Sequence, residues 1–289
     1  MTDYSDGHWQ SRDGLTLHYR DYPGPADRAP DRPVVLCLHG LTRNARDFEG
    51  LATDLAREWR VICPEMRGRG DSTYASDSST YTPLQYADDL GQLFAQAGIE
   101  RVVAIGTSLG GLLTMILAMV DSARIAAAVL NDIGPEVDAG GIARIRGYVG
   151  QGRSFPTWMH AARALQESAG DVFPDWATAD WLTMAKRCMT LGSNGRIVFD
   201  YDMKIAEPFA QEENVAGADL WPGWLALAGR PLLVLRGETS DILTRDTLAQ
   251  MLAKVPEAEA VTVPRVGHAP TLDEPAARAA IRALLDKVT

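Results

Sequence analysis

Short, wholly apolar runs that alternate with amphipathic helical patterns constrain the fold of this chain most strongly. Residues 34–38 read Val-Val-Leu-Cys-Leu, a continuous run typical of a strand covered on both faces. Further strands are expected at residues 15–20, 60–63, 102–105, 126–130, 231–235 and 260–263. Helical patterns separate them, at residues 48–58, 82–97, 108–120, 246–254 and 274–287. Such alternation predicts an α/β protein with a mainly parallel sheet and right-handed crossovers.

The pattern changes after the strand that ends near residue 130. Residues 134–220 show helical segments without a convincing buried strand, and they are rich in large apolar side chains. We interpret this stretch as an inserted helical cap. The expected division is therefore a core at residues 1–133, a cap at 134–220, and the rest of the core at 221–289.

Composition narrows the partners and the compartment. The net charge of −10 disfavours binding to nucleic acid or to an anionic membrane surface, both of which need clustered cations. The three cysteines form neither a disulfide framework nor a CxxC metal motif, so we expect no metal and a reducing compartment. The N-terminus lacks a signal-peptide pattern, and the apolar stretch at 109–120 is too short to span a bilayer. We expect a cytoplasmic monomer or homodimer acting on a small-molecule substrate.

The segment Gly106-Thr107-Ser108-Leu109-Gly110 has the form GxSxG, which by itself is weak evidence. Here it follows a buried strand and opens a helix, the setting of a nucleophile elbow. The glycines remove Cβ atoms that would clash in so sharp a turn, and the helix N-terminus directs N–H groups toward the reacting atom. Ser108 is therefore the expected nucleophile, and a Gly-Ser helix cap is the alternative.

A serine hydroxyl needs a base, and His268 lies in a loop directly after the last expected strand. A carboxylate between the serine and the histidine in the chain should orient the imidazole. Asp241, which follows the strand at 231–235, is the preferred acid. Glu238 is a near rival, and Asp132 is a second rival because it follows the strand after the elbow strand.

Two backbone N–H groups are expected to form an oxyanion hole. Leu41 follows His39-Gly40 at the end of a buried strand, and Leu109 follows the nucleophile. Arg43, two residues beyond Leu41, could meet a substrate carboxylate at the pocket rim, although a solvated surface arginine is the favoured interpretation. Cap residues that could line a pocket are Trp158, Trp181 and Met184.

Together these residues resemble the α/β-hydrolase fold superfamily, in its cap-bearing serine hydrolase branch. The matching motifs are His39-Gly40, Arg67-Gly68-Arg69-Gly70-Asp71-Ser72, Gly106-Thr107-Ser108-Leu109-Gly110-Gly111, Asn131-Asp132-Ile133-Gly134-Pro135, Asp241 and Gly267-His268. The resemblance implies an eight-stranded, mostly parallel sheet with helices on both faces and a helical cap over the pocket. It also implies catalysis without metal or organic cofactor.

The leading hypothesis is hydrolysis of an ester or lactone of a small, fairly apolar substrate through an acyl-enzyme. Carbon–carbon bond hydrolysis of a diketone or ring-fission product would use the same triad, so the sequence does not separate the two. A ligand receptor on the same fold is a third hypothesis, disfavoured by the intact set Ser108, Asp241 and His268.

Overall fold

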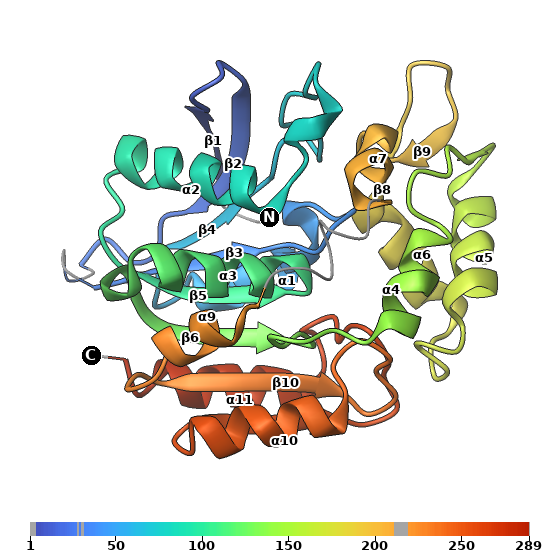
Figure 1. Cartoon of the computed structure of the whole chain (residues 1–289). Coiled ribbons are helices and arrows are strands. Elements are labelled where there is room, and N and C mark those ends of the chain that lie inside the picture. Colours follow the sequence, from blue (N-terminus) through green and yellow to red (C-terminus); the bar gives the residue numbers. More distant parts are fainter. Residues whose placement is uncertain (1–3, 28, 30–31, 211–218, 289) are drawn as a thin grey trace.

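The computed structural model describes residues 4–27, 29, 32–210 and 219–288 (Figure 1). An eight-stranded sheet in the order β1-β2-β4-β3-β5-β6-β10-β11 forms its centre. The strands are β1 (Ser5–Gln10), β2 (Thr16–Tyr22), β3 (Val34–Leu38), β4 (Val61–Pro64), β5 (Val102–Thr107), β6 (Ile125–Asn131), β10 (Leu232–Gly237) and β11 (Glu259–Val263). Strands β1 and β2 pair antiparallel, β2 is antiparallel to β4, and the other neighbours are parallel. The expected eight-stranded, mostly parallel sheet is confirmed.

Helices cover both faces of this sheet because its central strands are apolar on both sides. All five residues of β3 are buried, with Val34, Leu36 and Leu38 in one core and Val35 and Cys37 in the other. The first core is closed by α2 (Pro83–Ala97), α3 (Leu109–Val120), α9 (Trp221–Ala226) and α10 (Arg245–Lys254). The second is closed by α1 (Glu49–Leu55) and α11 (Pro275–Leu285).

The part of the chain from α4 to α7, between β6 and β10, lies beyond the end of β6 at which the chain leaves the sheet (Figure 1). It contains the helices α4 (Ala139–Arg146), α5 (Trp158–Ala169), α6 (Thr178–Cys188) and α7 (Ala206–Phe209), with a 3-10 turn, η4 (Met203–Ile205). Part of the expected cap, residues 211–218, is outside the described residues. The limits of the cap at residues 134 and 220 remain our interpretation.

This segment, in which we expected helices and no buried strand, also contains three short, partly buried strands. A small antiparallel sheet in the order β7-β9-β8 joins β7 (Ser154–Phe155), β8 (Met189–Leu191) and β9 (Ile197–Phe199). Strands of two or three residues are too short to show the alternating pattern on which sequence reading depends. None of the described helices has the length and apolar character needed to cross a membrane.

Candidate active site

Ser108 occupies the tight turn between β5 and α3. Its backbone has φ 52° and ψ −114°, a strained conformation for a residue with a side chain. The turn requires glycine on both sides. A Cβ on Gly106 would lie 2.3 Å from the carbonyl oxygen of Gly110, and one on Gly110 would lie 2.0 Å from that of Leu38. The Ser108 side chain makes no helix-capping hydrogen bond, so the alternative of a Gly-Ser cap does not apply.

Three side chains from distant parts of the chain form one hydrogen-bonded row. Ser108 Oγ lies 2.9 Å from His268 Nε2, and His268 Nδ1 lies 2.8 Å from Asp132 Oδ2. A carboxylate can only accept, so Nδ1 carries the proton and Nε2 offers its lone pair to the serine hydroxyl. This is the arrangement in which an imidazole can take a proton from a serine.

The structure corrects the preferred acid: Asp132, and not Asp241, is bonded to His268. The Asp241 carboxylate pairs instead with Arg144 on α4, with oxygen–nitrogen distances of 2.5 and 2.8 Å, and its side chain is 42% exposed. The hydrogen bonds from Arg144 lower the pKa of Asp241. The other rival, Glu238, is also directed elsewhere and accepts the backbone N–H of Arg265.

The turn after β10 explains why Asp241 misses the histidine. Ser240 N–H donates to the Gly237 carbonyl, and the Ser240 hydroxyl accepts from two backbone N–H groups beyond Asp241. Helix α4 also presses on this turn, since a Cβ on Gly141 would lie 2.1 Å from the Asp241 carbonyl oxygen. The chain therefore directs Asp241 toward α4 and away from the row of three side chains.

Asp132 is fully buried and held from two sides. Its backbone N–H donates to the Leu235 carbonyl, and its Oδ1 accepts the N–H of Gly237 at 2.8 Å. A φ of 58° at Asp132 turns the side chain off the end of β6. The end of β10 thus supplies a backbone N–H that donates to Asp132, and it does not supply the carboxylate that binds His268.

Asn131, a residue that sequence reasoning missed, fixes the histidine loop to the sheet. Its Nδ2 donates to the Thr107 hydroxyl at 3.0 Å and to the Pro270 carbonyl at 2.8 Å. Asn131 is fully buried. The sequence signal that pointed to Asn131 was its place beside Asp132. Its bond to a loop 139 residues away is not visible in the local sequence around a strand end.

The two expected oxyanion donors lie beside Ser108. Leu41 and Leu109 both line a cavity that includes Ser108, and among the described residues neither backbone N–H has a protein acceptor. The peptide group that carries the Leu41 N–H is fixed through its carbonyl, that of Gly40, which accepts from the Arg43 N–H and from His39 Nδ1. The next carbonyl, that of Leu41, accepts from Arg69 Nε at 2.9 Å.

His39 is uncharged and holds the peptide group between Gly40 and Leu41 in place. Its Nε2 accepts the Met66 N–H at 3.0 Å, so the proton is on Nδ1, which donates to the Gly40 carbonyl at 2.7 Å. Burial, together with the nearby Arg69 charge, lowers the pKa of His39 to about 4. The imidazole therefore stays uncharged at neutral pH.

This lowered pKa predicts an acid-sensitive stability. The unfolded chain takes up a proton at His39 near its ordinary pKa of 6.5, whereas the folded chain resists protonation down to about 4. The free energy of unfolding should therefore fall by about 3 kcal/mol between pH 6.5 and 4 through this group alone. Denaturant unfolding of wild type and His39→Asn across this range measures it. The variant should be less stable at pH 7 and lose less stability on acidification; parallel pH curves would contradict the prediction.

Two cavities meet at Ser108. One, about 560 Å³ in volume and here called the apolar cavity, is lined mainly by aliphatic and aromatic side chains from α3, α4 and the segment before β10. The other, about 260 Å³ and here called the arginine cavity, contains His268 and four arginines. Leu41, Ser108 and Ile145 line both.

Some of the expected substrate-contact residues line a cavity, and one packs against the core instead. Arg43, Trp181 and Met184 line the arginine cavity. Trp158 lines neither cavity, and its expected role is wrong. It is the first residue of α5 and packs partly buried against the second core, so its large apolar side chain serves helix packing.

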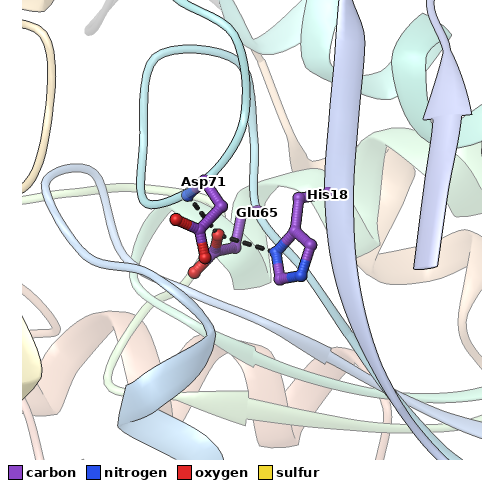
Figure 2. Close-up of side chains that lie close together, drawn as sticks. All are labelled: His18, Glu65 and Asp71. Carbon is purple, nitrogen blue, oxygen red and sulfur yellow. Dashed lines mark hydrogen bonds and ion pairs between the residues drawn. The ribbon is translucent and has the colours of Figure 1, made fainter. Parts of the chain in front are cut away.

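A separate cluster, His18, Glu65 and Asp71, brings ligand-type atoms within 4.8 Å of one another (Figure 2). Protein partners already bind the ligand-type atoms of His18 and Glu65: the His18 nitrogens bond to Glu65 and Asp6, and Glu65 accepts the N–H groups of Ala45 and Asp71. Burial lowers the pKa of His18, but the bonds to Glu65 and Asp6 outweigh it and raise the pKa overall. The cluster therefore joins β2 to the loops that follow β3 and β4.

Comparison with known proteins agrees with this architecture. Residues 35–281 match the model of the alpha/beta hydrolase family, and the chain belongs to that family. It is 38% identical over 267 residues to a 3-hydroxybutyrate-oligomer hydrolase of Cupriavidus necator, covering 90% of each chain.

Two solved structures are similar over the whole chain. A crystal structure of an alpha/beta hydrolase from Novosphingobium aromaticivorans is 66% identical, with a TM-score of 0.94 and full coverage of both chains. A putative hydrolase from Rickettsia typhi is 26% identical, with a TM-score of 0.86 over 99% of this chain and 100% of the other.

Proposed function

We propose that this protein is a cofactor-independent serine hydrolase that cleaves a carboxylic ester of a small molecule through an acyl-enzyme. The observation that carries the proposal is the row Ser108–His268–Asp132, with distances of 2.9 and 2.8 Å. The strained elbow and two backbone donors beside Ser108 support it. The relative from Cupriavidus necator supports an ester, and in particular an ester of a short hydroxy acid, as the substrate.

The proposed reaction has two halves. Ser108 Oγ attacks the ester carbonyl while His268 Nε2 takes the hydroxyl proton, and the N–H groups of Leu41 and Leu109 stabilise the negative oxygen. His268 then gives this proton to the leaving alcohol, which departs and leaves Ser108 acylated. A water molecule, deprotonated by His268, then attacks the acyl carbon. As the bond between this carbon and Ser108 Oγ breaks, His268 gives the proton to Oγ, which restores the serine hydroxyl and releases the carboxylic acid.

Covalent labelling tests the nucleophile directly. A fluorophosphonate probe should phosphonylate Ser108, and mass spectrometry of the digested protein should find the adduct on the peptide containing residues 106–111. Addition of a short-chain ester should slow labelling by competition for the same site. An intact protein that hydrolyses esters but carries no adduct at Ser108 contradicts the proposal.

The carbon–carbon hydrolase alternative is tested in the same assay. A vinylogous diketone is offered beside a short-chain nitrophenyl ester of similar size. We expect turnover of the ester to dominate. Faster turnover of the diketone would show that Ser108, His268 and Asp132 serve carbon–carbon bond cleavage instead.

A further inference from the structure

The two cavities at Ser108 differ in charge. Among the described residues that line the apolar cavity, the charged ones are Glu136 and Asp219, both acidic. The arginine cavity is lined by four arginines and a single carboxylate, Asp47. This concentration of positive charge occurs in a chain whose net charge is −10. A negatively charged part of a substrate is therefore repelled from one cavity and attracted to the other.

Three of the four arginines are already paired with carboxylates. Arg43 pairs with Asp47 at 2.5 Å. Arg144 pairs with Asp241 at 2.5 Å, and Arg187 with Asp273 at 2.6 Å. These pairs leave little charge for a substrate.

Arg153 is different, because it bonds to no carboxylate within the described part of the chain. Its guanidinium lies over the ring of Phe155, with 5.4 Å between its central carbon and the ring centroid. The ring restricts the guanidinium without neutralising it. Its charge and N–H groups thus remain available at the wall of the cavity that contains His268.

The position of His268 indicates which half of an ester lies in the arginine cavity. The general acid must reach the leaving alcohol oxygen in order to protonate it. His268 lines the arginine cavity and not the apolar one, whereas Leu109, an oxyanion donor, lines the apolar cavity. The alcohol half of the substrate then lies in the arginine cavity, and the acyl half extends into the apolar cavity.

We propose that Arg153 binds a free carboxylate on the alcohol half of the ester, so that the substrates are esters formed at the hydroxyl group of a hydroxy acid. This assignment rests on the proposed function, because it takes Ser108 as the nucleophile and His268 as the acid. The guanidinium and the carboxylate form a charge-assisted, two-pronged hydrogen bond.

An isomeric pair of substrates tests the orientation. In 3-(butyryloxy)propanoate the carboxylate is on the alcohol half, whereas in propyl hydrogen succinate the same atoms place it on the acyl half. Both are anions of equal size, so bulk charge does not separate them. We expect kcat/KM of the wild-type protein to favour the first isomer by about tenfold or more, mainly through KM.

Removal of the Arg153 charge tests whether this residue binds the substrate carboxylate. Arg153→Gln should lower the ratio of the two kcat/KM values about tenfold, and Arg153→Lys should retain part of the preference, since lysine keeps the charge but loses the two-pronged geometry. The matched control is Arg163→Gln on α5, the same charge change at an exposed position that lines neither cavity. This control should keep the wild-type ratio and rates.

The outcomes separate the two proposals. A wild-type ratio of one or below, or a ratio that Arg153→Gln leaves unchanged, overturns the assignment of Arg153 while ester hydrolysis stands. Hydrolysis of both isomers that persists in Ser108→Ala overturns the proposed function, and the assignment with it. Thermal unfolding of each variant verifies that the fold is intact.

Discussion

Asp132→Asn is expected to lower kcat on a short-chain ester by about 10⁴-fold, with little change in KM. The reason lies in the N–H of Gly237, which donates to Asp132 Oδ1. An asparagine there keeps its oxygen on Gly237 and turns its NH₂ group toward His268 Nδ1. The imidazole must then carry its proton on Nε2, where it faces the Ser108 hydroxyl and can no longer accept a proton.

The matched control for this change is Asp241→Asn, the same substitution at the acid that the sequence favoured. Because Asp241 bonds to Arg144 and not to the histidine, its kcat should change by less than about tenfold. The experiment compares steady-state kinetics and fluorophosphonate labelling rates for both variants. Loss of activity in Asp241→Asn with retention in Asp132→Asn would reverse the assignment of the acid.

Ser108→Ala is expected to remove ester hydrolysis to the background rate, a loss of at least about 10⁴-fold. The Ser108 Oγ bonds to His268 Nε2 and makes no capping bond, so its removal leaves the elbow and α3 supported by their backbone contacts. Loss of the nucleophile also removes the covalent step, so no burst of released alcohol should appear in the first turnover.

The readouts for this variant are steady-state rates, the first-turnover burst and the melting temperature. Ser122→Ala, at the far end of α3, controls for loss of a serine near the same helix. We expect wild-type rates for this control. Ester hydrolysis by folded Ser108→Ala at more than about 1% of the wild-type rate would contradict a serine nucleophile.

Local stereochemistry made much of the candidate site predictable. The elbow depends on close approaches among Gly106, Gly110 and the residues next to them, and a five-residue motif contains most of that information. The position of His268 in a loop after the last strand follows from the strand pattern, since parallel strands end at one edge of the sheet. The places of Leu41 and Leu109 beside the site follow in the same way, because Leu41 comes after β3 and Leu109 comes after Ser108.

The sequence by itself thus determined the α/β fold, the sharp turn that holds Ser108, and the places of His268 and the Leu41 loop at the same edge of the sheet. Only the tertiary structure decided which carboxylate bonds to His268, because Asp132 and Asp241 both follow a strand of the sheet. The choice depends on long-range contacts: Gly237 donates to Asp132, while Arg144 and α4 hold Asp241. Within the described residues Arg153 has no carboxylate partner, and this too appears only in three dimensions, since a sequence does not state which arginines its carboxylates neutralise.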